Sequence, residues 1–247
     1  MKGKYMADFF GGQGSVAAGC RAQGLQARGF DTQHGDEFDL TRASVRRPVI
    51  RDIADGKIVA AALGPPCGSW GPAGNRTAVL RTQAEPWGIS TRPLTEKESA
   101  RIEVGNNTME ATLKLVKALH RHRVPWIFEH PQASKVYSTK EWQEVMALPS
   151  VHTRTADQCQ YGTKWRKRTT FTCGHMDELD TERLSWRCTG KRGWCSRTGK
   201  RHWHLEGTAP GGKRWTAISQ AYPPKLGRAM SMALLAPLHA KAYNKVF

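Results

Sequence analysis

The chain has 247 residues, enough to bury a full hydrophobic core as one large domain or as one domain with an appendage. Its 38 lysines and arginines against 21 acidic residues give a formal net charge of +17, which predicts a polyanionic partner. No apolar run reaches membrane-spanning length, and no basic amphipathic helix stands out. Composition therefore argues against a membrane protein and favours nucleic acid over an acidic membrane surface as the partner.

Strand-like and helix-like segments alternate along the first 150 residues, a pattern typical of an α/β fold with a parallel sheet. Strands are expected at 5–10, 27–32, 58–63 and 124–128. Helices are expected from Ser15, over 40–56 despite Pro48, and over 96–122. A last helix is expected over 222–244, with Pro224 near its start.

The segment 164–214 differs in character, because it holds thirteen lysines and arginines against five acidic residues. Five of the nine tryptophans lie in or just after it, at positions 165, 186, 194, 203 and 215. Basic residues interleaved with aromatic ones suit contacts with a nucleic-acid backbone together with base stacking. Tryptophan is also a common core residue, so stacking and core packing both remain open as the function of these side chains.

The six cysteines are scattered and do not form the pattern of a secreted disulfide framework. The first ten residues, MKGKYMADFF, lack the long apolar core and the cleavage site of a signal peptide. We therefore expect a monomeric cytoplasmic protein with reduced thiols.

A glycine-rich turn follows the first predicted strand. Phe10, Gly12 and Gly14 form the pattern F-x-G-x-G, where the backbone can approach a ligand closely and a helix amino terminus favours negative charge. Asp31 follows the second strand, where such folds place a carboxylate for ribose hydroxyls, although a plain turn aspartate is equally expected. Asp39 lies at another strand-to-helix junction, and a helix cap is the alternative there.

The third predicted strand ends in the residues GPPC. Pro65 and Pro66 cannot continue a strand ladder, so Cys67 lies just beyond the carboxyl end of a buried strand, where open α/β sheets place their chemistry. No cysteine or histidine lies within a few residues of Cys67, which argues against a metal ligand. A buried structural thiol is an alternative, but a nucleophilic thiolate in basic surroundings fits best.

Three charged residues later in the chain, Glu129, Arg166 and Arg168, are further candidates for the site of Cys67. Glu129 ends the next strand, in WIFEHP, and is expected at the same edge as Cys67. Arg166 and Arg168 stand at alternate positions in YGTKWRKRTTF, so a strand would project both to one side. A surface glutamate and a solvated basic strand are the alternatives.

The order of these motifs resembles that of the DNA cytosine-5 methyltransferases over nearly the whole chain. The motifs are F-x-G-x-G, Pro-Pro-Cys, a Glu at the end of a strand, and Arg-x-Arg. The departures, Glu-His-Pro in place of Glu-Asn-Val and Lys164 in place of Gln, make the chain similar to a short, phage-like branch of that family. The resemblance implies a Rossmann-like sheet with a small basic recognition subdomain, in the cytoplasm of a bacterium or a phage-infected cell. It implies a catalytic domain at 1–171, the recognition subdomain at 172–218 and a returning segment at 219–247.

The resemblance also implies roles for the residues. S-adenosylmethionine would be bound by Phe10, Gly11, Gly12, Gly14, Asp31, Asp39 and Pro65. Cys67 would add to carbon 6 of a cytosine flipped out of DNA, so that carbon 5 becomes nucleophilic towards the methyl group. Glu129 would hydrogen-bond the ring nitrogen and amino group, and Arg166 and Arg168 are the arginines of Gln-x-Arg-x-Arg, with Arg166 at the base carbonyl. An RNA methyltransferase and a catalytically silent nucleic-acid-binding protein are the alternatives.

Two features lie outside the pattern of that family. Cys173, Cys188, Cys195 and His202 are candidate ligands of a structural zinc ion, although no Cys-x-x-Cys pair is present and free thiols are the alternative. Lys225 follows the second proline of AYPPKL, near the position where the family carries an asparagine beside the cofactor. A lysine there would pair with the extra carboxylate of carboxy-S-adenosylmethionine and permit carboxymethyl transfer, and a solvent-facing lysine is the alternative.

Overall fold

Six strands form one mixed sheet within residues 3–74 and 78–243, the part of the chain that this computed structural model describes. Across the sheet the strands follow the order β2-β1-β3-β4-β6-β5. The parallel strands are β1 (Tyr5–Phe9), β2 (Ala27–Phe30), β3 (Ile58–Leu63) and β4 (Trp126–Pro131). The antiparallel strand β6 (Arg168–Gly174) lies between β4 and β5 (Val151–Asp157). The predicted α/β fold is confirmed.

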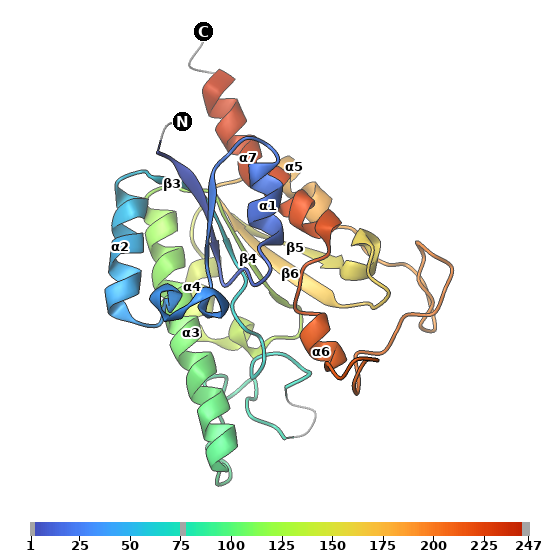
Figure 1. The fold of residues 1–247 in the computed structure, drawn as a ribbon. Coiled ribbons are helices and arrows are strands. Elements are labelled where there is room, and N and C mark those ends of the chain that lie inside the picture. The colour runs from blue at the N-terminus through green and yellow to red at the C-terminus, as the bar shows by residue number, and fades with distance from the viewer. Residues whose placement is uncertain (1–2, 75–77, 244–247) are drawn as a thin grey trace.

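Helices cover both faces of the sheet (Figure 1). One face packs against α2 (Ala43–Ala54), α3 (Glu96–Arg121) and α4 (Lys140–Met146), and the other against α1 (Ser15–Arg21) and α7 (Pro224–Tyr243). Successive strand residues point to opposite faces, so Ala7 and Phe9 of β1 pack in the first layer and Met6 in the second. Burial on both faces explains why the strands show apolar runs with little polar alternation.

Short helices occupy several connections. They are η1 (Thr32–His34), η2 (Asp36–Phe38), η3 (Lys135–Ser138), η4 (Gln158–Tyr161), α5 (Glu178–Thr181), η5 (Glu182–Leu184) and α6 (Trp215–Ile218). The helix expected over 40–56 forms as α2, which continues through Pro48 and buries Val49 and Ile53. None of the helices described, from residue 3 to 74 and from 78 to 243, is long and apolar enough to cross a membrane.

The order of the strands reverses at β1, which decides where a ligand can enter. β2 pairs with one side of β1 and β3 with the other, so a crevice opens outside the carboxyl ends of β1 and β3. Leu63 at the end of β3 pairs with both Phe9 and Phe128. One edge of the sheet therefore holds the residues that follow β1, the residues that follow β3, and Glu129 in the last part of β4.

The sheet extends past residue 171, where the catalytic domain was expected to end. β6 continues to Gly174, which pairs with Trp126 of β4. A side chain at position 174 would collide with the buried Trp126 ring, so only glycine fits there. The sheet thus includes Cys173, and β5 adds an edge strand that the sequence pattern did not indicate.

Candidate active site

Cys67 lies in the turn that follows β3, and two attachments to α3 fix this turn in place. The Cys67 carbonyl accepts hydrogen bonds from the amides of Trp70 at 3.1 Å and Gly71 at 2.9 Å. The buried Trp70 ring donates its Nε1 proton to the Gly105 carbonyl of α3 at 3.1 Å. The guanidinium of Arg81, itself 1% exposed, lies 3.7 Å from the centre of the Trp70 ring and donates to the Ile102 carbonyl of α3 at 3.0 Å.

Two charged groups act on the Cys67 thiol: Glu129 in β4 and Lys167, the residue just before β6. Burial raises the pKa of the thiol above its ordinary value, the Glu129 carboxylate raises it further, and the Lys167 ammonium partly offsets both effects. Lys167 Nζ lies 3.8 Å from Glu129 Oε1, so the two charges offset one another beside the sulfur. The edge of the sheet therefore combines a thiol, a buried acid and a cation, as nucleophilic catalysis requires.

Glu129 is 5% exposed, and of its two oxygens only Oε2 accepts a hydrogen bond, whereas Oε1 faces the more distant Lys167 ammonium. The Tyr222 hydroxyl donates to Glu129 Oε2 at 2.9 Å, and burial together with the Glu129 charge places the pKa of Tyr222 well above its ordinary value. Gly64 is required beneath this bond, because a side chain there would run into the Tyr222 hydroxyl. Within the described residues Glu129 Oε1 has no hydrogen-bond donor, which leaves that oxygen for a ligand.

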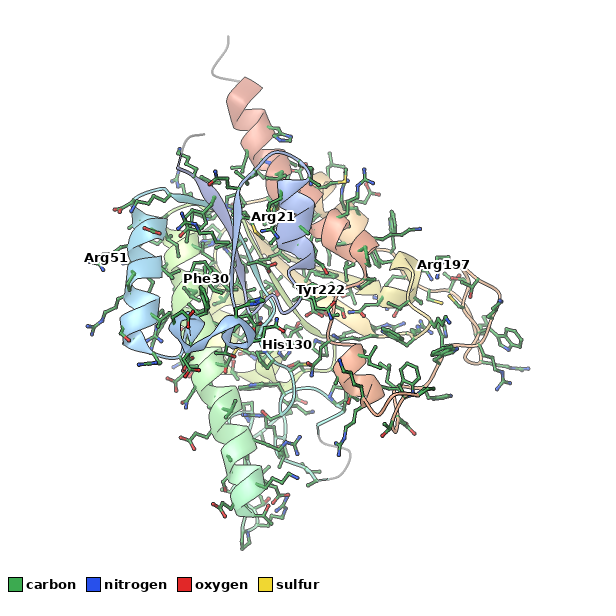
Figure 2. All side chains as sticks on the ribbon, in the orientation of Figure 1. Arg21, Phe30, Arg51, His130, Arg197 and Tyr222 are labelled. Atoms are coloured by element: carbon green, nitrogen blue, oxygen red, sulfur yellow. The ribbon has the colours of Figure 1, made fainter. Side chains whose placement is uncertain are left out.

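His130 stands where the resembled family carries the asparagine of Glu-Asn-Val. Its ring is buried and stacked on Phe128, with 5.4 Å between the ring centroids. Burial first, and then the Lys167 charge, lower the pKa of His130 to about 3, so the ring stays neutral. Figure 2 shows His130 and Tyr222 near the middle of the molecule, far from Arg197 in the basic segment 164–214.

Arg166 and Arg168 point to the same side, as predicted, but they meet a buried carboxylate there. Arg168 Nε donates to Asp157 Oδ1 at 3.0 Å, and Arg166 Nε lies 3.3 Å from the same oxygen. Burial opposes ionisation of Asp157, yet hydrogen bonds from Arg168, the Cys188 amide and Arg166 lower its pKa overall. Both arginines are thus engaged by Asp157, and the cation beside Cys67 is Lys167, which the sequence interpretation did not select.

The glycine loop after β1 has the backbone that its sequence predicts. Phe10, Gly12 and Gly14 all have positive φ angles, of 57°, 54° and 68°. The Gly12 amide donates to Asp31 Oδ2 at 2.9 Å, so the predicted ribose-binding carboxylate lies directly against the loop. A Cβ atom at Gly14 would meet nothing within 4 Å, which leaves open space at the start of α1.

Asp8, in β1, supports this loop from below, and the sequence interpretation did not select it. Asp8 is 1% exposed and accepts a hydrogen bond from the Ala17 amide of α1 at 3.1 Å. A side chain at Gly11 would overlap the Asp8 carboxylate, so this residue must be glycine. Burial raises the pKa of Asp8 to about 6.

Three predicted cofactor residues remain, Pro65, Asp39 and Lys225, and Lys225 lies apart from the glycine loop. Pro65 is buried in the turn before Cys67, and Asp39 Oδ1 accepts hydrogen bonds from the Thr41 amide at 2.9 Å and hydroxyl at 2.6 Å. Lys225 lies elsewhere: Gly227 of α7 faces α1, and Lys225, two residues away on the helix, projects to the other side. There it lines a surface groove with Arg183 and Trp186. This placement gives no support to a Lys225 contact with a cofactor carboxylate.

Three of the five tryptophans in or just after the basic segment are exposed, and none of the five belongs to the buried core. Trp186, Trp194 and Trp203 are 52%, 47% and 44% exposed, whereas the core tryptophans lie in the first 150 residues. Lys164 Nζ lies 4.2 Å from the centre of the Trp203 ring, and Trp203 meets Trp215 edge to face at 5.1 Å. Cations beside exposed aromatic rings favour the nucleic-acid hypothesis for this segment over core packing.

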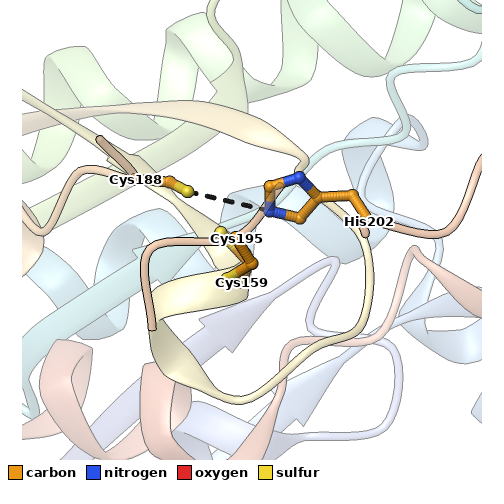
Figure 3. Close-up of side chains that lie close together, drawn as sticks. All are labelled: Cys159, Cys188, Cys195 and His202. Carbon is orange, nitrogen blue, oxygen red and sulfur yellow. Dashed lines mark hydrogen bonds between the residues drawn. The ribbon is translucent and has the colours of Figure 1, made fainter. Parts of the chain in front are cut away.

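The predicted metal ligands are corrected at one position. Cys159, Cys188, Cys195 and His202 converge, with all their ligand atoms within 4.8 Å of one another (Figure 3). Cys173 does not belong to this group, because β6 turns its side chain into the core layer under α1 and α7. Cys159, from η4 between β5 and β6, takes its place.

Comparison with known proteins finds similarity to solved structures and to nothing else. No protein-family model and no curated protein matches the chain. Among similar solved structures, a mutant DNMT2 from Spodoptera frugiperda has a TM-score of 0.39 and 10% identity, covering 69% of this chain and 50% of that one. The methyltransferase EhMeth of Entamoeba histolytica has a TM-score of 0.42 and 8% identity, covering 100% of both chains. The Dnmt2 methyltransferase of S. pombe has a TM-score of 0.41 and 10% identity, covering 87% and 63%. The chain spans about half the length of the Spodoptera protein.

Proposed function

We propose that this chain is an S-adenosylmethionine-dependent methyltransferase that modifies carbon 5 of cytosine in DNA through a covalent adduct with Cys67. The observation that carries the proposal is the convergence of Cys67, Glu129 and Lys167 at the sheet edge that also holds the glycine loop. A thiol nucleophile, an acid for the ring and an adjoining cofactor cradle are the parts that this reaction needs.

The loop after β1 fits an adenosyl cofactor. Gly12 and Gly14 allow close approach of a ligand to the backbone, and the Asp31 carboxylate, which accepts from the Gly12 amide, would bind the ribose hydroxyls. The amino terminus of α1 favours negative charge, as a methionine carboxylate would supply. When bound, S-adenosylmethionine would supply an electrophilic methyl group at the crevice beside Cys67.

The residues of the chain would carry the remaining steps. Lys167 favours the thiolate of Cys67, which attacks carbon 6 of the cytosine and turns carbon 5 into an enamine-like nucleophile. Glu129, held at Oε2 by Tyr222, would share a proton between Oε1 and the pyrimidine ring nitrogen, and this proton would neutralise the negative charge that develops there. Carbon 5 would then take the methyl group, and the broken sulfur–methyl bond would leave S-adenosylhomocysteine. Loss of the carbon 5 proton to a base would restore the double bond between carbons 5 and 6 and expel the Cys67 thiolate.

The target base has to leave a duplex to reach these groups, at a cost of a few kcal/mol. The exposed tryptophans and the basic residues around them would stabilise the opened strand by stacking and by phosphate contacts. The number of these tryptophans and basic residues is consistent with binding DNA. An enzyme that acts on RNA would use the same contacts.

The test is transfer of a labelled methyl group to duplex DNA, single-stranded DNA and transfer RNA, followed by mass spectrometry of the digested nucleosides. We expect 5-methylcytosine from DNA. Label only in RNA would identify the RNA enzyme, and tight binding to either polymer without transfer would identify a silent binding protein. Either of these outcomes overturns the proposal.

Lys167→Met is expected to move the acid limb of the pH–rate profile to higher pH. Lys167 lowers the pKa of Cys67, so its loss raises that pKa and reduces the thiolate fraction at neutral pH. Below the thiol pKa the rate should fall about tenfold for each pH unit of displacement. The measurement is single-turnover methyl transfer over a range of pH.

Two matched variants distinguish this effect from a loss of general positive charge. Lys167→Arg keeps the cation and should keep the profile. Lys164→Met removes a lysine from the same segment, beside Trp203, and should weaken nucleic-acid binding without moving the acid limb. An unchanged acid limb in Lys167→Met would show that Lys167 does not act on the thiol.

A further inference from the structure

We propose that Cys159, Cys188, Cys195 and His202 form a tetrahedral zinc site. This site would hold the basic lobe, residues 185–214, on the sheet that carries Cys67 and Glu129. The four ligand atoms lie within 4.8 Å of one another, and Cys188 Sγ and His202 Nε2 are 3.7 Å apart. Zinc–sulfur and zinc–nitrogen bonds of about 2.3 and 2.0 Å at a tetrahedral angle place the sulfur and the nitrogen about 3.5 Å apart. Three thiolates and one imidazole are a set typical of structural zinc, with no position left for a substrate.

Hydrogen bonds around the cluster prepare three of the four ligands for a metal. The Gly193 carbonyl lies 3.0 Å from His202 Nδ1, which fixes the proton there and leaves Nε2 to face the sulfurs. The Ser196 amide and hydroxyl lie 3.4 and 3.5 Å from Cys188 Sγ, and Gln160 Nε2 lies 3.5 Å from Cys159 Sγ. Donors directed at sulfur favour the charged thiolate form that zinc binds.

The lobe has little else to fold it. Between residues 185 and 214 the described chain contains two isolated bridges, Trp194–Arg201 and Thr208–Arg214, and no regular helix or strand. The buried cluster of this region consists of the three cysteines themselves. A segment that buries so little apolar surface requires another source of free energy, which a metal supplies in small domains.

The site also connects the lobe to the sheet. Cys159 follows β5 directly, in η4, whereas the other three ligands belong to the lobe. The Cys188 amide donates to Asp157 Oδ2 at 2.9 Å, and the Cys188 carbonyl accepts from Arg166 at 2.9 Å. Zinc would therefore fix the position of the exposed tryptophans relative to the catalytic edge, a role that is independent of which polymer the chain binds.

The test is the metal content of the tag-free protein, measured by inductively coupled plasma mass spectrometry after purification without chelators. We expect about one zinc per chain in the wild type and in Cys173→Ala, and a loss to near zero in Cys159→Ser. Retention of zinc in Cys159→Ser together with its loss in Cys173→Ala would overturn the assignment of ligands. A wild-type chain that stays below a tenth of an equivalent, even after incubation with zinc, would overturn the site.

A second measurement covers the case in which Cys159→Ser fails to fold. Cobalt replaces zinc in the wild-type chain, and its absorption should show intense ligand-field bands of a tetrahedral site together with thiolate charge-transfer bands. Weak octahedral bands without charge transfer would contradict three thiolate ligands. Chelation should also accelerate proteolysis within 186–214 while the sheet stays intact, and equal protection with and without chelator would contradict a structural role.

Discussion

Cys67→Ser is expected to abolish the covalent complex with DNA that contains 5-fluorocytosine and to reduce methyl transfer by at least about 10⁴-fold. A serine hydroxyl is not ionised at neutral pH, so the attack on carbon 6 is lost although the side chain keeps nearly the same shape. Fluorine at carbon 5 cannot leave as a proton does, and the wild-type enzyme should therefore stay attached. Intact-mass analysis measures both the adduct and the group transferred.

Controls have to separate chemistry from binding and folding. Cys67→Ser should bind DNA with unchanged salt dependence and melt at the same temperature, because the turn is held by the Cys67 carbonyl, the Trp70 ring and Arg81 rather than by the sulfur. An adduct that persists in Cys67→Ser would place the nucleophile elsewhere. A wild-type protein that binds the fluorinated DNA and forms no adduct would contradict the mechanism.

The position of the catalytic edge could be predicted from the sequence because backbone rules determine it. Pro65 and Pro66 end β3, and parallel strands end at one edge, so Cys67 and Glu129 had to lie near the glycine loop. Gly12 and Gly14 likewise take positive φ angles at the turn where the F-x-G-x-G pattern indicates them. Local sequence carries this information without any knowledge of tertiary contacts.

The partners of the charged residues could not be predicted in the same way. Alternation indicates that Arg166 and Arg168 share a side and that Lys167 takes the other, but it does not say which side faces Cys67. The answer depends on Asp157, which is buried at the end of a strand, β5, that the apolar pattern did not indicate. Asp157 stands alone two residues before Cys159, and nothing in the sequence around an isolated aspartate indicates that it is buried.

The choice among the cysteines failed for a related reason. Cys188, Cys195 and His202 are evenly spaced and lie together in the structure, but the fourth residue of their cluster, Cys159, comes from a different part of the chain. Cys173 is closer in sequence, yet its place in β6 turns it into the core between Ile127 and His152. The orientation of a strand residue depends on register, which the sequence of one strand does not determine.

Asp157→Ala is expected to destabilise the protein by about 3–5 kcal/mol, because it removes the one partner that several buried or half-buried groups share. The Asp157 side chain is fully buried, and its oxygens lie within 3.6 Å of the guanidinium groups of Arg166, Arg168 and Arg187. The Cys188 amide would also lose its acceptor. Urea denaturation, measured with excess zinc so that the metal content is constant, gives the free energy of unfolding.

The matched control is Glu178→Gln, which breaks an ion pair of similar length at the surface. Arg154 Nη2 lies 2.9 Å from Glu178 Oε2, but the glutamate side chain is 74% exposed, so water replaces the lost partner and stability should hardly change. Asp157→Asn should fall between the two variants, since it keeps the shape and one acceptor but not the charge. If Asp157→Ala were as stable as Glu178→Gln, the arginines would be solvated without Asp157, and they would then be free to bind the phosphates or the base of a nucleic acid.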